Sequence, residues 1–171
     1  MLDGEFRDPH VWQDGDEWFC LVGSGLENDQ GGTALVFSSD DCADWSYDGH
    51  LHELPDPEDH PELGEVWKLP VLLPLGEDSN GVEKHVFCID PHAGDADVEV
   101  WCWIGEWDCA NREFSSGFED PKLIDEGDGH FTGPSGLVGP NGRSILFTIT
   151  QDYRPRRCAT SRGRSSATST A

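Results

Sequence analysis

Short runs of apolar and aromatic residues recur along the chain, and each is bounded by Gly, Asp, Asn or Pro. Their lengths fit β-strands, and no stretch with the period of an amphipathic helix is long enough to compete with them. The pattern therefore predicts an all-β protein. The expected strands cover residues 10–13, 18–23, 34–38, 71–75, 85–89, 98–104, 136–139 and 144–150.

These runs repeat as a larger unit. In three places an apolar segment that begins at a proline leads through a Gly-containing turn into a second apolar segment, and the prolines, Pro9, Pro70 and Pro134, lie 61 and 64 residues apart. Residues 34–45 and 98–114 supply further runs after the first and second units. Four strands joined by Asp-Gly or Asn-Gly turns are typical of a propeller blade. We therefore predict a partial β-propeller with about two and a half blades of four-stranded antiparallel sheets.

Charge divides the chain into two parts. All 34 Asp and Glu residues lie at or before Asp152, whereas the last 18 residues carry five Arg and no acid. We predict that residues 1–152 form the propeller and that residues 153–171, a basic Ser/Arg-rich tail, are disordered or not part of the fold.

The net charge limits the range of partners. The 34 acidic and 11 basic residues give a formal net charge of -23, which excludes nucleic acid and anionic membranes as partners because both would be repelled. At 1 M salt the Debye length falls to about 3 Å and the self-repulsion is screened, so we expect a halophilic protein. The sequence shows neither a signal peptide nor an apolar run of membrane-spanning length, so we expect a cytoplasmic location.

The cysteines do not suggest a metal site. The six of them include no C-x-x-C pair and no histidine partners at zinc spacing. Cys20, Cys88 and Cys102 lie within apolar runs and are expected to be small buried hydrophobic residues. We therefore predict no metal ion and no cofactor.

A candidate site follows from the segments that precede the three repeated prolines. First strands of successive blades converge on the central axis of a propeller, so Asp8, Lys68 and His130 are predicted to face one funnel. An Arg-Asp pair before a proline is also typical of a structural turn, in which the carboxylate accepts hydrogen bonds from local N–H groups.

The motifs resemble those of glycoside hydrolase family 32, the invertase, levanase and fructanase group, whose N-terminal domains are five-bladed propellers. Residues 6–9 match its F-R-D-P motif in full, and residues 67–70 match its W-E-C-P-type motif except at the second and third positions. Residues 125–134 resemble its D-x-G-x-D-F-Y-A-P segment, with Pro134 one residue late, and residues 142–146 resemble G-R-x-I-L. The resemblance covers residues 6 to 152 and implies a partial five-bladed β-propeller.

The resemblance also implies roles for single residues. Family members cleave β-fructofuranosides with retention, using two carboxylates. Asp8 corresponds to the aspartate that stabilises the transition state, with Arg7 as its orienting partner, and Lys68 occupies the position of the acid/base glutamate. The N-D-P-N-G motif that carries the nucleophile does not occur before Phe6, and Glu65 is a conceivable but unfavourably spaced substitute acid.

The substrate-binding residues implied in this way, beside Arg7, are Trp12, Trp67 and His130; for both Trp residues, packing in the blade core is an equally good interpretation. We expect a hydrolase of fructosyl bonds in sucrose or fructans whose catalysis is crippled in this chain. Two alternatives remain open: a non-catalytic carbohydrate-binding propeller fragment and an arabinan-type five-bladed glycosidase. Exposed blade edges predict self-association.

Overall fold

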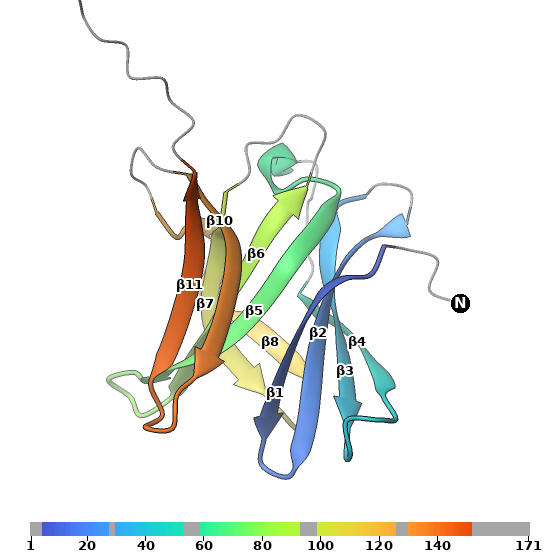
Figure 1. The fold of residues 1–171 in the computed structure, drawn as a ribbon. Coiled ribbons are helices and arrows are strands. Elements are labelled where there is room, and N and C mark those ends of the chain that lie inside the picture. The colour runs from blue at the N-terminus through green and yellow to red at the C-terminus, as the bar shows by residue number, and fades with distance from the viewer. Residues whose placement is uncertain (1–4, 28–29, 53–58, 93–98, 126–129, 152–171) are drawn as a thin grey trace, which may run out of the picture.

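The computed structural model describes residues 5–27, 30–52, 59–92, 99–125 and 130–151, and these form β-strands with one short 3₁₀ turn, η3 (Pro61–Leu63). The strands make three antiparallel sheets that stand side by side, with the second sheet between the first and the third (Figure 1). The tail predicted at residues 153–171 and the domain boundary at residue 152 lie outside the described residues.

The first sheet is a complete four-stranded blade. Its order along the sheet is the same as along the chain, so it is a meander. The hairpin turn between its first two strands contains Gly15, whose φ of 62° is accessible to glycine at no steric cost. Its strands are β1 (Arg7–Asp14), β2 (Glu17–Gly25), β3 (Gly32–Ser39) and β4 (Ser46–His52).

The second sheet repeats this plan. The carboxylate of Asp78 accepts hydrogen bonds from the backbone N–H groups of Asn80 and Val82, which closes the turn of its first hairpin. The sheet has one addition, a two-residue strand that pairs with its third strand. Its strands are β5 (Val66–Glu77), β6 (Glu83–His92), β7 (Trp101–Asp108), β8 (Glu113–Ser116) and β9 (Lys122–Leu123).

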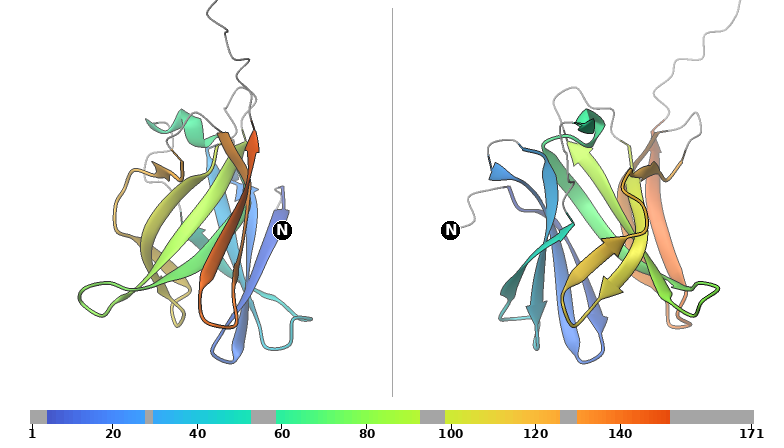
Figure 2. Two further views of the ribbon diagram at one scale, coloured as in Figure 1. Left: turned by 60° about the vertical axis from the view of Figure 1, so that its left-hand side comes forward. Right: turned by 180° about the vertical axis from the view of Figure 1, so that it is seen from behind.

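The third sheet is half a blade. It contains β10 (His130–Val138) and β11 (Ser144–Gln151), and within the described part of the chain β11 pairs with β10 alone. The fold class predicted from the sequence, two blades and the opening half of a third, is confirmed. Figure 2 shows the same arrangement from two further sides.

Two apolar clusters hold the blades together. The cluster between the first and second blades includes Phe19, Trp67 and Trp103, and that between the second and third includes Val71 and Leu73. Strand β5 serves both, because Leu72 faces the first cluster while its two neighbours face the second, as the two-residue period of a strand requires.

The cysteines of the apolar runs are buried and free, as expected: Cys20, Cys88 and Cys102. Cys88 and Cys102 lie opposite each other on β6 and β7. Burial raises the pKa of both thiols, so they behave as apolar side chains at neutral pH.

Candidate active site

The first strands of the three blades share one irregularity. In each of them a residue in the left-handed region directly precedes the proline: Asp8 (φ 53°), Leu69 (φ 48°) and Gly133 (φ 62°). In each of them the pairing register also shifts at this point, so each strand has a β-bulge there. A left-handed conformation at a residue other than glycine costs about 1–3 kcal/mol and is concentrated at functional sites.

Alignment on the bulges shows which residues are equivalent. Arg7, Lys68 and Thr132 each lie two residues before the proline, and Asp8 corresponds to Leu69 and Gly133. His130, which was predicted to face the funnel with Asp8 and Lys68, lies two residues before Thr132 and pairs with Gln151 on β11. Only the backbone position of His130 is described.

The three bulges meet at one small cavity. It has a volume of about 180 Å³ and is lined by residues near the starts of β1, β5 and β10, which are the upper ends of these strands in Figure 1. Asp8, His10, Leu69, Pro134 and Ser135 are among its lining residues. The first strands therefore converge, and Asp8 lies at this small cavity, which we call the neck of the funnel.

The two charged residues beside this neck have different partners. Asp8 is exposed and its carboxylate makes no hydrogen bond with the rest of the described chain. The guanidinium of Arg7 donates to Glu5, with 2.5 Å between Nε and Oε2, and this contact raises the pKa of Arg7 and lowers that of Glu5. Asp8 acts on Arg7 only as a nearby negative charge that further raises the Arg7 pKa, and the hydrogen bond of Arg7 within the described chain goes to Glu5.

Position 68 lies beside a buried acid that the sequence did not reveal. Lys68 is the cross-strand partner of Asp90 on β6, and only 3% of Asp90 is exposed. One carboxylate oxygen accepts from the Thr132 hydroxyl at 2.6 Å and from the Gly133 N–H at 2.9 Å. Asp90 therefore ties the second blade to the bulge of the third.

Comparison with known proteins identifies the family to which the chain belongs. The model of the glycosyl hydrolases family 32 N-terminal domain matches residues 2–168. The chain belongs to this family. A sucrose-6-phosphate hydrolase of Salmonella typhimurium is 28% identical over 152 residues, which are 84% of this chain and 30% of that protein. One of Bacillus subtilis (strain 168) is 29% identical over 155 residues, which are 83% of this chain and 29% of that protein.

Solved structures of family 32 share the fold. A Bombyx mori β-fructofuranosidase in complex with sucrose matches with a TM-score of 0.65 at 24% identity, over 84% of this chain and 29% of that one. A fructan 1-exohydrolase of Cichorium intybus in complex with 1-kestose matches with a TM-score of 0.65 at 21% identity, over 84% of this chain and 27% of that one. The chain thus spans about 30% of the length of these relatives. The family match decides against an arabinan-type glycosidase.

Trp67, a residue of the family's second motif, lies in the core. Its side chain is fully buried, with ring centroids 5.4 Å from Trp103 and 6.0 Å from Phe87. A ring without exposed surface has none to offer a sugar, so its implied contact with substrate is corrected to core packing, the second interpretation given above.

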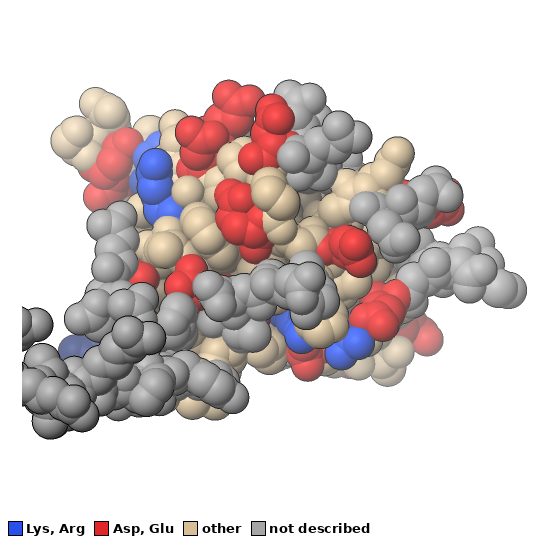
Figure 3. Space-filling model, turned by 90° about the horizontal axis from the view of Figure 1, so that it is seen from above, with Lys and Arg blue, Asp and Glu red and all other residues tan. Residues whose placement is uncertain are grey.

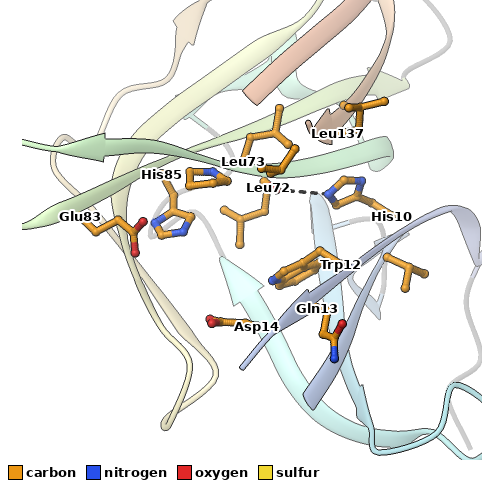
Figure 4. Close-up of a pocket in the computed structure, with 13 residues that line it drawn as sticks. His10, Trp12, Gln13, Asp14, Leu72, Leu73, Glu83, His85 and Leu137 are labelled. Atoms are coloured by element: carbon orange, nitrogen blue, oxygen red, sulfur yellow. Dashed lines mark hydrogen bonds between the residues drawn. The ribbon is translucent and has the colours of Figure 1, made fainter. Parts of the chain in front are cut away.

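Trp12 lies farther along its strand than the neck. It stacks on His10 and Phe19 and meets Trp107 edge-on. It lines a second cavity of about 470 Å³, shown in Figure 4. The position of Trp12 within the sequence repeat could not show which of the two cavities its side chain lines.

This second cavity carries histidines that sequence analysis did not single out. His10 is 3.2 Å from the Leu72 carbonyl oxygen through Nε2, and burial lowers its pKa. His85, also largely buried, has a lowered pKa for the same reason, although the carboxylates of Glu83 and Asp14 oppose the shift. The residues that line the two cavities come from β1, β5, β6 and β10, and Figure 4 shows His10 and His85 on opposite walls of the larger cavity.

Acidic side chains are spread over the upper face of the molecule, and Lys and Arg occupy small areas of it (Figure 3). Among the described residues no group of His, Cys, Asp and Glu is placed to hold a metal ion. None of the helices in the described part of the chain has the length and apolar character needed to cross a membrane.

Proposed function

We propose that this chain is the substrate-holding part of a glycosidase acting on fructosyl bonds of sucrose or fructans, and that it does not cleave these bonds by itself. The observation that supports the proposal is the bulge of β5, because Lys68 lies directly before its left-handed residue and two residues before the proline, where the family motif has its acid/base glutamate. The proteins named in the comparison, sucrose-6-phosphate hydrolases and fructofuranosidases, support the class of substrate.

A lysine cannot do the work of the missing carboxyl group. In a retaining glycosidase that group protonates the leaving oxygen and then, as a carboxylate, activates water. General acid catalysis contributes about 10²–10⁴-fold, and an ammonium group would also stand beside a transition state of positive character. We expect no compensation by Glu65, because it is exposed and precedes β5.

Asp8 is the residue that we expect to grip the sugar. Its carboxylate is exposed at the neck and has no internal hydrogen-bond partner in the described chain, so its oxygens can accept from fructosyl hydroxyls. Hydrogen bonds to a charged acceptor are about twice as strong as neutral ones. The same feature supports the second candidate function, a carbohydrate-binding module without any catalytic role.

Binding and hydrolysis should separate in one experiment. We expect the chain to bind fructo-oligosaccharide by calorimetry without releasing reducing sugar, and Asp8→Asn to weaken binding about tenfold, since a charged acceptor is lost. Asp16→Asn, the same change at the tip of the β1–β2 hairpin, should leave binding unchanged. If the parent chain released sugar and Asp8→Asn did not, the proposal that this chain does not cleave the bond would be wrong. If Asp8→Asn bound the sugar as tightly as the parent chain, the proposed sugar contact of Asp8 would be wrong.

We propose further that a second copy of the chain pairs along β11. The support is the unpaired edge of this strand in the described part and the apolar side chains that the half blade exposes, with Phe147 55% and Ile149 62% exposed. Light scattering after size-exclusion chromatography in about 1 M salt, where repulsion is screened, should give a dimer or larger species. Ile149→Lys should shift the equilibrium towards the monomer. Leu75→Lys, a change at an exposed residue of β5, should leave the equilibrium unchanged. Equal effects of the two substitutions would exclude β11 as the interface.

A further inference from the structure

The larger of the two cavities continues the neck along the same three strands. It is lined by residues 10–14 of β1, 72–74 of β5 and 136–138 of β10, together with Glu83 and His85 of β6. Its volume of about 470 Å³ lies within the range of sites that hold small molecules. His10 lines both cavities, whereas Asp8, to which we assign the sugar contact, lines the neck alone. The larger cavity is therefore separate from the proposed sugar site.

The charge of this cavity is negative. Asp14 and Glu83 supply two carboxylates, and none of the described residues that line the cavity is Lys or Arg. The histidines do not compensate for this charge, because burial lowers the pKa of His10 and His85 and so keeps both rings neutral at neutral pH. The cavity therefore attracts cations and repels anions.

His85 brings hydrogen-bonding capacity that the protein leaves unused. It is 9% exposed, and its buried Nδ1 atom has no hydrogen-bond partner in the described part of the chain. A buried polar group without a partner is costly. The carboxylates of Glu83 and Asp14 lie close enough to act on the His85 pKa, and Figure 4 shows these three residues at one end of the cavity and His10 at the other. One end of the cavity is thus polar, acidic and incompletely hydrogen-bonded.

The wall on the side of the third blade is apolar. It includes Leu137 and Val138, which are 48% and 47% exposed. Figure 4 shows Leu137 near His10, away from the acidic end. An alkyl chain that lies along this wall removes apolar surface from water, which is favourable. The cavity therefore combines negative charge at one end with apolar surface towards the other.

We propose that this cavity binds a small aliphatic primary amine in its ammonium form, with the ammonium group between Asp14 and Glu83 and the alkyl chain directed towards Leu137. Hydrogen bonds between ionised groups are about twice as strong as neutral ones. Asp14 retains acceptor capacity, because the Nε1–H group of Trp107, at 3.3 Å from Oδ2, uses one of about four lone-pair sites of the carboxylate. An aliphatic amine has a pKa near the value of about 10.4 for lysine, so it carries its charge at neutral pH.

An NMR titration of the isotope-labelled full chain tests this site with butylamine, butanol and methylamine. A solution of about 1 M potassium chloride reduces the Debye length to about 3 Å, so that the general attraction of cations to the acidic surface is screened while direct contacts persist. We expect butylamine to bind at least about tenfold more tightly than butanol, which lacks the charge, and than methylamine, which lacks the chain. The backbone amide signals that shift should belong to residues 10–14, 83–85 and 136–138.

Substitutions of single carboxylates identify the acidic end. Glu83→Gln, a change at an exposed residue, should weaken the binding of butylamine about tenfold, because a neutral amide replaces a charged acceptor. Asp14→Asn should act in the same direction. Glu113→Gln removes the same charge from an exposed residue of β8 that does not line the cavity, and it should leave binding unchanged. Circular dichroism confirms in each case that the strands are formed.

The outcomes separate this inference from the proposed function. Equal binding of butylamine and butanol would overturn the requirement for charge, and equal binding of butylamine and methylamine would overturn the contact with the apolar wall. Equal effects of Glu83→Gln and Glu113→Gln, shifts confined to residues outside the cavity, or absence of binding would overturn the site itself. None of these results affects the sugar contact assigned to Asp8, because Asp8 does not line this cavity.

Discussion

Gly32→Ala should destabilise the protein by about 3 kcal/mol, a large share of the roughly 5–15 kcal/mol that stabilises a typical domain. A Cβ atom at Gly32 would lie 2.0 Å from Cδ1 and 2.4 Å from Nε1 of Trp67. Trp67 cannot move aside, because it is fully buried among Trp103 and Phe87. Urea denaturation followed by tryptophan fluorescence measures the effect.

A double-mutant cycle tests whether the clash is the cause. Trp67→Phe removes Nε1 and leaves a smaller ring with more room to move away from a Cβ atom at Gly32, so Gly32→Ala should cost less in that background, with a coupling energy of about 1 kcal/mol or more. Gly139→Ala is the control, because its nearest neighbour is the end of the Asn141 side chain at 3.3 Å. Additive effects of the two substitutions would show that Trp67 does not set the requirement for glycine.

Acidification from pH 7.5 to 4.5 should destabilise the protein by about 3 kcal/mol or less through His52. Burial lowers the pKa of His52 from 6.5 to about 4. Between pH 6.5 and about 4, His52 is therefore protonated in the unfolded chain and neutral in the folded chain. The free energy of unfolding consequently decreases as the pH falls from about 6.5 towards 4. Burial lowers the pKa of His10 and His85 in the same direction.

The environment of His52 explains why it stays neutral. Its ring lies 4.9 Å from that of Trp103 and 6.0 Å from that of Phe114, and its buried Nε2 has no hydrogen-bond partner within the described part. His52→Phe keeps an aromatic ring there and should reduce the loss of stability on acidification, measured as the urea midpoint at several pH values. His60→Gln, a change beside the surface carboxylate of Glu62 at 3.1 Å, should retain it. A pH dependence unchanged in His52→Phe would exclude His52 as its source.

Most of the fold could be predicted because a blade is a local structure. Alternating apolar runs and Asp-Gly or Asn-Gly turns lie close together along the chain, and each expected run overlaps a strand of the structure. The bulges could not be predicted. Nothing in Leu69 suggests a left-handed backbone, since a residue before proline usually has an extended conformation.

The candidate site was predicted in part for the same reason. The motif around Asp8 and the lysine at position 68 are local patterns; Asp8 lines the cavity at the three bulges, and Lys68 lies directly before Leu69, which also lines it. Whether Trp67 faces a ligand or the core depends on Gly32, which belongs to another blade and leaves room for the indole. The contact between Asp90 and Thr132 likewise joins residues of two blades.

The sequence by itself determined the repeat, the strands, the family and the presence of a lysine at position 68, where the family motif has a glutamate, because each of these depends on residue identity and short spacing. Tertiary structure alone decided which side chains meet. It placed Lys68 opposite Asp90 and beside the strand that carries Arg7, buried Trp67, and paired His130 with Gln151. Such contacts depend on how separate sheets pack and on the register of their bulges, and packing between distant segments leaves no periodic signal in a single chain.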